Sequence, residues 1–347
     1  MSVENNSGGV SMKDIAKACG VSVVTVSRAL KGDRNHSPET RARIVEAAER
    51  LGYRPSPLVS ALMSARGRHK PAKSTVNLAL LNPGGEWPGH PFYEGARAQA
   101  RALGFSTEMF TLSAKNGGGG EGARLRAMWE ARGVRGVLVL PSIKAETRLE
   151  VDLSGFATAT IGYSVIAPNM PRVVTDTYGR VMEALNRVEA RGYRRIGVLG
   201  TDDLDRRFQH LSMAAVQVFL NTGKRTATVE RLNVDPAVAN RSICAEVLAW
   251  VKRRKLDVIV AQLSVYEGLR AAGLSIPEDL GYVYLHATDN PVVTSMDQNQ
   301  SWIGRKATDV VVGMINRNEF QVPEQSQTIM IPSRWCEGTT LPQRRKM

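Results

Sequence analysis

Residues 12–32 read MKDIAKACGVSVVTVSRALKG, and residues 37–55 continue with SPETRARIVEAAERLGYRP. The first stretch contains two short amphipathic runs. Between them stand Gly20, which breaks a helix, and Ser22, a residue type that often caps one. Two short helices joined by a tight turn with a glycine form a helix-turn-helix. The sequence therefore predicts this motif near the N-terminus.

A third helix is predicted to follow the motif. Ser37 is a capping residue, Pro38 suits the first helical position, and Glu39 complements the helix dipole. Gly52 ends the helix. Apolar residues recur at helical spacing in the second and third helices, which indicates a small core between them. The residues expected to face inward are Val26, Leu30, Ile44, Ala47, Ala48 and Leu51.

The composition limits the classes of function. A chain of 347 residues with a formal net charge of +13 allows two or three compact units and favours a polyanionic partner. Charge alone does not separate DNA from RNA or from a membrane surface. The first ten residues carry no export signal and are expected to be a disordered tail, and no stretch is apolar for the length of a membrane span. We therefore expect a cytoplasmic protein with no membrane partner. The three cysteines, Cys19, Cys244 and Cys336, have no metal-ligand or redox spacing and are expected to be free thiols.

The residues from Met12 to Pro55 closely resemble the headpiece of the LacI/GalR (lactose-repressor) family of bacterial regulators. The resemblance implies a helix-turn-helix DNA-binding domain over residues 11–55. It also implies a sequence-specific transcription regulator, usually a repressor, that binds double-stranded operator DNA of pseudo-palindromic sequence as a homodimer. The chain is expected to need no cofactor.

The resemblance places the second helix in the major groove of DNA. Val23 and Val24 match the positions that read bases in the family, and their apolar side chains favour contact with thymine methyl groups. The alternative is that both are core valines. Arg28 can reach a guanine or a phosphate, and a solvated surface charge is the alternative for Arg41. The remaining contacts predicted in this region are the hydroxyls of Ser22, Thr25 and Ser27.

Residues 56–74 are expected to form a hinge helix and a basic linker. The run Leu58 to Met63 is only a turn and a half of helix, which is marginal alone in water. The resemblance implies that this helix forms when two copies meet on DNA, with Leu62 wedged into the minor groove. Val59 shares a face with Leu62, and Tyr53 is a further expected DNA contact. The alternative is a linker helix packed on the body.

From residue 75 onward, apolar strands alternate with amphipathic helices, a pattern typical of parallel sheets with crossover helices. The glycine run at 117–120 lacks the Lys-Ser/Thr of a phosphate loop and is expected to be a flexible loop. The expected strands are 76–81, 136–140, 157–161, 195–199, 257–261 and 281–285. The expected helices are 92–103, 123–132, 180–191, 211–220, 237–255 and 266–272.

The body also resembles the effector domain of the same family, which is shared with periplasmic sugar receptors. The likeness rests on ARGVRGVLVLP (131–141), VEARGYRRIGVLG (188–200), LSIPEDLGYVYL (274–285) and IPSRWCEGTTL (331–341). It implies an effector-binding and dimerisation domain over 75–342, built as two doubly wound parallel-sheet subdomains with a cleft between them. The expected subdomains are 75–172 with 299–330, and 173–298 with 331–342, before a tail at 343–347.

A small-molecule effector is expected beyond the carboxyl ends of the strands, where ligands of open α/β sheets bind. His286-Ala287 stands where several relatives have an aspartate pair that binds sugar hydroxyls, so a hexose bound in the usual way is doubtful. A carbohydrate or a derivative remains the expected class. A structural role is the alternative for His286. The predicted effector-binding residues are Asn82, Arg206, Arg207, Gln262, His286 and Gln298.

Two other functions are alternatives to a ligand-responsive regulator. An enzyme is not favoured, because the sequence has no catalytic triad order, metal cluster or nucleotide fingerprint, and we predict no catalytic or metal-binding residue. A DNA-binding module whose body no longer senses a ligand stays open, because of the change at His286-Ala287. The final residues, TTLPQRRKM, lack a heptad pattern, so we expect a dimer rather than a tetramer.

Overall fold

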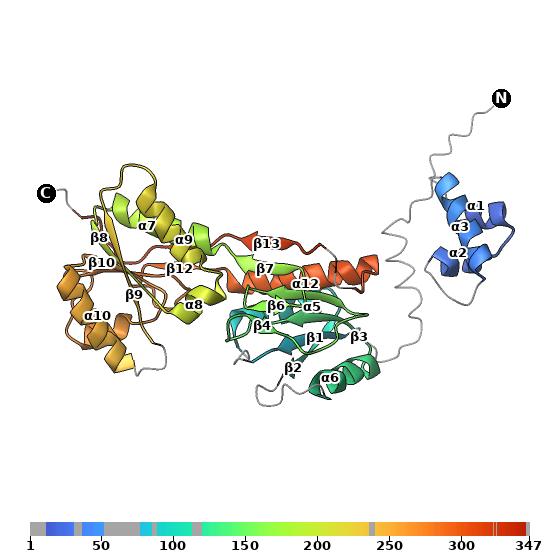
Figure 1. Cartoon of the computed structure of the whole chain (residues 1–347), viewed down its shortest axis with the longest axis horizontal. Coiled ribbons are helices and arrows are strands. Elements are labelled where there is room, and N and C mark those ends of the chain that lie inside the picture. Colours follow the sequence, from blue (N-terminus) through green and yellow to red (C-terminus); the bar gives the residue numbers. More distant parts are fainter. Residues whose placement is uncertain are drawn as a thin grey trace, which may run out of the picture. The chain divides into compact units, whose positions relative to one another are not determined.

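The computed structural model describes residues 12–30, 37–51, 77–84, 89–112, 120–235, 240–321, 323 and 325–344. The chain divides into two units, Met1–Ala72 and Lys73–Met347, which are shown in Figure 1 and described separately here. The N-terminal tail and the hinge, with Tyr53, Val59 and Leu62, lie outside the described residues.

Within its described residues, the N-terminal unit contains three helices, α1 (Met12–Cys19), α2 (Val23–Leu30) and α3 (Pro38–Arg50). Ile15, Val26 and Ile44 are fully buried between them, and Ala47 and Ala48 complete the packing. The predicted helix-turn-helix, the third helix and its inward face are confirmed.

The first sheet of the body has six parallel strands in the order β13-β7-β5-β3-β1-β2. Alternate side chains of β1 enter opposite cores, because a strand points successive residues to opposite faces. Leu78 and Leu80 pack with α5 and α12, whereas Ala79 and Leu81 pack in the core that contains α6 residues. The strands are β1 (Asn77–Asn82), β2 (Ser106–Thr111), β3 (Val134–Val139), β5 (Ala157–Ile161), β7 (Arg172–Thr175) and β13 (Thr328–Ile331); the helices are α5 (Pro91–Ala102), α6 (Gly120–Ala131) and α12 (Gln300–Arg317). A separate pair joins β4 (Thr147–Arg148) to β6 (Val165–Ala167).

The second sheet has the order β14-β12-β11-β10-β8-β9, and only β14 is antiparallel to its neighbour. One face packs against α7 and α9, and the other against α10 and α11. The strands are β8 (Arg195–Gly200), β9 (Thr228–Asn233), β10 (Val258–Ala261), β11 (Gly281–Tyr284), β12 (Ser295–Asp297) and β14 (Arg334–Cys336). The helices are α7 (Thr177–Ala190), α8 (Asp202–Arg207), α9 (Leu211–Asn221), α10 (Asn240–Arg254) and α11 (Tyr266–Ala271).

Two glycines allow α5 and α12 to touch backbone to backbone. A Cβ atom on Gly95 of α5 would lie 2.0 Å from the carbonyl oxygen of Ser301, and one on Gly304 of α12 would lie 2.1 Å from that of Phe92. Both distances are far below an ordinary van der Waals contact, so only glycine fits at either position.

Three segments of the chain pass between the two sheets and are bonded to one another. The Asp176 amide donates to the Ile331 carbonyl at 2.8 Å, and Asn299 Nδ2 donates to the Pro332 carbonyl at 2.8 Å. Asn299 has a φ of +53°, which asparagine tolerates better than most residues. These bonds tie together the chain after β7, before α12 and after β13.

All six predicted strands and all six predicted helices of the body are present, with ends that differ by up to three residues. The boundaries predicted at residues 172 and 330 fall inside β7 and β13, so the first subdomain extends through residues 175 and 331. The structure also contains elements that were not predicted from the sequence, namely α8, α12, β2, β4, β6, β7, β9, β12, β13 and β14.

Candidate DNA-binding face and effector site

The N-terminal end of α2 presents two valines to solvent. Ser22 caps the helix, since its Oγ accepts a hydrogen bond from the Thr25 amide at 3.1 Å. The cap places Val23 and Val24 in the first turn, where their side chains are 38% and 59% exposed. The alternative that they are core valines is wrong. An apolar, solvent-exposed helix end is suited to contact with methyl groups on a partner.

The structure describes the side chains of only some of the predicted DNA contacts in this unit. The hydroxyls of Ser22 and Thr25 lie 2.9 Å apart, and each can still bond a further group because a hydroxyl both donates and accepts. The backbone of Ser27, Arg28 and Arg41 lies in α2 or α3, but their side chains are outside what the structure describes.

Three predicted effector residues meet at the carboxyl end of the second sheet, because β10, β11 and β12 are neighbours there. His286 follows β11, Gln262 follows β10, and Gln298 follows β12. Gln298 Nε2 lies 2.8 Å from His286 Nδ1, and Gln262 Nε2 donates to Ser212 Oγ at 2.7 Å. The side chains of both glutamines are therefore already engaged within the protein.

His286 is held as a neutral imidazole. Burial lowers its pKa to about 3, and the positive charges of Arg180 and Arg207 act in the same direction. Because the ring is neutral, Nδ1 accepts the Gln298 hydrogen bond, and the ring also bonds the backbone of Gln262. With these bonds satisfied, we interpret His286 as a residue that positions its neighbours.

Arg180 of α7 is a buried cation that the sequence analysis did not select. Its side chain is 1% exposed, Nη1 donates to the Leu285 carbonyl at 2.9 Å, and the guanidinium lies over the Phe208 ring at 5.5 Å. Burial lowers its pKa to about 10. The Nε and Nη2 atoms are buried and have no hydrogen-bond partner among the described residues. A helical signal for Arg180 was available, since it precedes the inward-facing Ala184 and Val188 by four and eight residues.

The adjacent arginines of α8 have different surroundings. Arg206 has a side chain that is 56% exposed and lies 3.9 Å from Asp203. Arg207 is partly buried, burial lowers its pKa, and its Nε is buried with no partner within the described ranges. The pair that the sequence left ambiguous therefore divides into a solvated Arg206 and an Arg207 close enough to influence His286.

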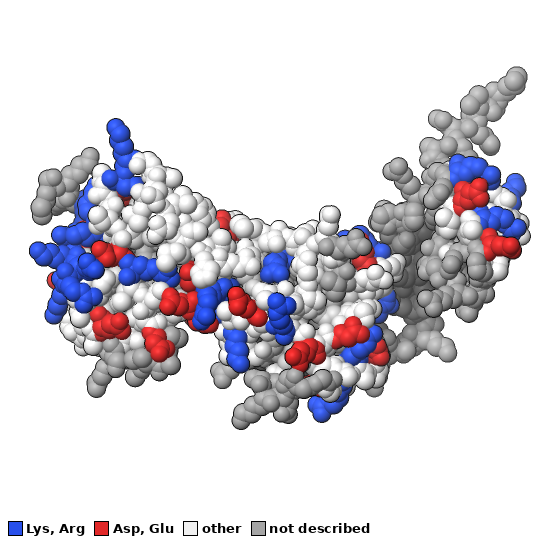
Figure 2. Space-filling view, viewed as in Figure 1, with Lys and Arg blue, Asp and Glu red and all other residues white. Residues whose placement is uncertain are grey.

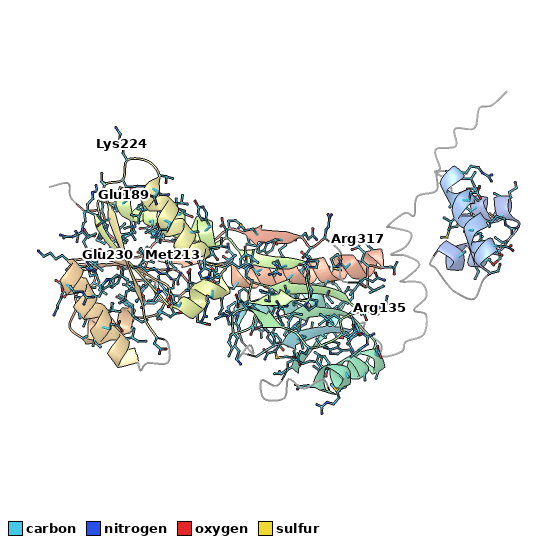
Figure 3. All side chains as sticks on the ribbon, viewed as in Figure 1. Arg135, Glu189, Met213, Lys224, Glu230 and Arg317 are labelled. Carbon is cyan, nitrogen blue, oxygen red and sulfur yellow. The ribbon has the colours of Figure 1, made fainter. Side chains whose placement is uncertain are left out.

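The helix α8 that carries these arginines is fixed at both ends. Thr201 Oγ1 caps its start by accepting from the Leu204 amide at 3.0 Å. Asp205 is buried and lies 3.4 Å from Arg231 and 3.1 Å from His210. The Arg231 guanidinium also contacts the sulfur of Met213 on α9, which is labelled in Figure 3. These contacts fix the helix α8, which carries Arg207.

Asn82 has a different setting from the other candidates. It ends β1 in the first sheet, is buried, and accepts a hydrogen bond from the Gly84 amide at 3.0 Å through Oδ1. This bond shapes the turn after β1. The other five predicted effector residues lie in the subdomain of the second sheet, in α8 or just after β10, β11 and β12.

The positive charge of the chain extends well beyond the headpiece. Figure 2 shows basic side chains gathered at the end of the body where α10 lies, and the last turn of that helix contains Lys252, Arg253 and Arg254. Net charge by itself therefore does not identify the DNA-binding surface. Within the described ranges, no helix is both long and apolar enough to cross a membrane.

Comparison with known proteins agrees with this division of the chain. Residues 11–56 match the model of the "Bacterial regulatory proteins, lacI family". The catabolite control protein A of Priestia megaterium is 42% identical over 74 residues, which cover 21% of this chain and 20% of that protein. The HTH-type transcriptional repressor PurR of Haemophilus influenzae (strain PittEE) is 23% identical over 348 residues, which cover 92% of this chain and 96% of that protein.

Solved structures share the fold over almost the whole chain. A complex of the transcriptional regulator CelR with cellobiose has a TM-score of 0.58 at 21% identity and covers 95% of this chain and 99% of that one. The lac repressor dimer bound to operator and the anti-inducer ONPF has a TM-score of 0.58 at 15% identity and covers 96% and 100%. The headpiece match, the full-length similarity to a repressor and this shared fold together make the chain similar to DNA-binding transcription regulators of the LacI/GalR family.

Proposed function

We propose that this protein is a cytoplasmic repressor that binds a pseudo-palindromic operator as a homodimer and is controlled by a small molecule in its body. The observation that carries the proposal is the pair of exposed valines at the capped start of α2, in a headpiece of this family. Solvent-exposed apolar side chains at this end of a recognition helix are explained by contact with bases.

The DNA-binding step combines two kinds of contact. Val23 and Val24 read thymine methyl groups in the major groove, and the Ser22 and Thr25 hydroxyls bond phosphate oxygens. Arg28 and Arg41 add contacts to bases or phosphates. In the hinge, Val59 supports the dimer while Leu62 unstacks the central base step, and Tyr53 contacts the DNA backbone. Two headpieces on one dimer then require two half-sites of related sequence.

Control by the ligand acts through the segments that connect the two sheets. A small molecule that bonds the carboxyl end of the second sheet and a residue of the first favours one relative setting of the two. The bonded segments at Asp176, Asn299 and Pro332 are where such a change is absorbed. The setting alters the separation of the headpieces and so couples ligand to operator. The CelR structure contains cellobiose, which supports a carbohydrate or a derivative as the class of ligand.

Selection of genomic DNA fragments by the purified full-length protein tests this function. The selection is done at near-physiological salt, because non-specific binding dominates at low salt. We expect recovery of a pseudo-palindrome, and we expect L62A to bind it more weakly while remaining a dimer in solution. Recovery of DNA with no preferred sequence would overturn the operator model, and unchanged affinity of L62A would remove the wedge.

A further inference from the structure

The buried guanidinium of Arg180 has an open binding edge. Its Nη1 is bonded to Leu285, but Nε and Nη2 are buried and have no partner in the described part of the chain. Nε and Nη2 lie on the same side of the planar group, and their parallel N–H bonds fit the two oxygens of a carboxylate or a phosphate. Leaving such donors buried and unbonded is costly, so the site is prepared for an acceptor from outside the protein.

A second open donor belongs to Arg207. Its Nε is also buried and has no partner among the residues that the structure describes, and its charge acts on the same histidine as that of Arg180. Arg207, Phe208, Tyr284 and His286 are partly exposed, and Phe208 and Leu285 contact the Arg180 side chain. The fully buried arginine is therefore the floor of a group of side chains that reaches the surface.

No carboxylate of the described residues neutralises these two cations by an ion pair. Asp176 acts on Arg180 and Asp203 acts on Arg207 only through space, because neither forms a salt bridge with it. Burial raises the pKa of the Tyr284 phenol, so Tyr284 supplies no negative charge at neutral pH. His286 is also nearby and is neutral. Among the described residues, these two desolvated positive charges thus have no carboxylate in direct contact, which is expensive unless a ligand supplies one.

We propose that the effector carries an oxyanion group, a phosphate or a carboxylate, that binds between Arg180 and Arg207 at the carboxyl end of the second sheet. This inference rests on the proposed function, since it names the chemistry of the ligand at the same site. The neutral His286 and the two glutamines hold the site together, and the organic part of the ligand extends toward the exposed side chains.

Thermal unfolding and calorimetry of the full-length protein test the inference with matched probes. Glucose 6-phosphate is compared with glucose, gluconate with glucose, and inorganic phosphate with chloride at equal ionic strength. The group that fits should raise the melting temperature, by about 5 °C at one hundred times its Kd, because it binds only the native state. A phosphate response identifies a phosphorylated effector, and a gluconate response identifies a carboxylate.

Neighbouring arginines provide the control. R207Q should weaken binding of the active probe about tenfold or more, whereas R206Q, on the solvated side of the same helix, should leave it unchanged. R180K keeps the charge but loses the planar edge and should also weaken binding. If R180K does not fold, the comparison of probe binding by R207Q and R206Q tests the inference. Equal effects of R206Q and R207Q, or no response of the wild type to any anionic probe, would overturn the inference.

The selection of DNA fragments separates this inference from the proposed function. Selection of a pseudo-palindrome by a protein that ignores every anionic probe would remove the oxyanion site and leave the regulator. Conversely, the protein could select no DNA sequence and yet bind an anion in a way that R207Q abolishes. That result would support the oxyanion site and reject the proposed function as a regulator.

Discussion

Replacing Gly304 with alanine tests the backbone contact between α5 and α12. The added Cβ would lie 2.1 Å from the Phe92 carbonyl oxygen, which cannot rotate away because it belongs to a helix. The two helices must separate by about 1 Å to restore an ordinary contact, and overpacking of this kind costs roughly 1 to 3 kcal/mol. Alanine gains about 1 kcal/mol over glycine inside a helix. Because the clash is with backbone, we expect a net loss of about 1 to 2 kcal/mol.

Gly313, in the same helix, supplies a matched control. A Cβ there would lie 3.1 Å from the end of the flexible Arg317 side chain, so the alanine meets nothing rigid. G313A should therefore gain up to about 1 kcal/mol from helix propensity.

Urea denaturation of both full-length variants, followed by far-ultraviolet circular dichroism, measures the two effects. For a slope near 3 kcal/mol per molar urea, the midpoint of G304A should fall by about 0.5 M and that of G313A should rise. Equal rises in both midpoints would show that the α5–α12 backbones are not in contact and would refute the reasoning.

Three further outcomes follow from the structure. V24A removes two methyl groups, and if one of them is buried against a thymine methyl the variant should bind the selected operator about fourfold more weakly. Replacing the contacted thymine by deoxyuracil should weaken the wild type but not V24A, and additive losses in a binding titration would contradict the contact. The folded-state pKa of His286 is about 3 and the unfolded value is about 6.5, so only the unfolded chain gains this proton as the pH falls below 6.5. Between pH 7 and 5.5 the wild type should therefore lose about 1 kcal/mol more stability than H286Q. Urea midpoints that change in parallel for the two proteins would argue against the neutral imidazole. D257A removes a buried carboxylate that accepts hydrogen bonds from the Arg194 and Arg195 amides at 3.1 and 3.0 Å. The variant should lower the free energy of unfolding by about 2 kcal/mol. An unchanged urea midpoint would show that water replaces the carboxylate.

The central strands could be predicted from sequence because they are buried on both faces. Runs such as Val258–Ala261 are apolar throughout, as expected for inner strands of a parallel sheet. The edge strands β2 and β9 read STEMFT and TVERLN and are mostly half-buried, so they carry no continuous apolar run. The helix α12 begins after the left-handed Asn299 without a side-chain cap, and this removed the usual start signal.

Some features of the candidate sites depend on neighbouring residues in the sequence, whereas others depend on residues far apart in the chain. The cap at Ser22 and the exposure of Val24 depend on residues within one turn, so the local sequence predicts them. The neutral state of His286 and the open edge of Arg180 depend on four elements far apart in the chain. Such desolvation has no local pattern, although the inward position of Arg180 on its helix was visible.

The positions of β13 in the first sheet and of α12 on its face also set the order in which the two sheets can be completed during synthesis. The strands up to β5 and the helix α5 are made by residue 161, but the face with Leu78 and Leu80 is fully covered only when residues 300–331 leave the ribosome. At ordinary translation speeds the 170 intervening residues take about 10 to 30 s. The second sheet draws most of its strands and all of its helices from the continuous stretch 177–297, so it can fold during that time. The half of the body that is translated first is thus completed last, and its apolar face is the part of the body that stays exposed longest during synthesis.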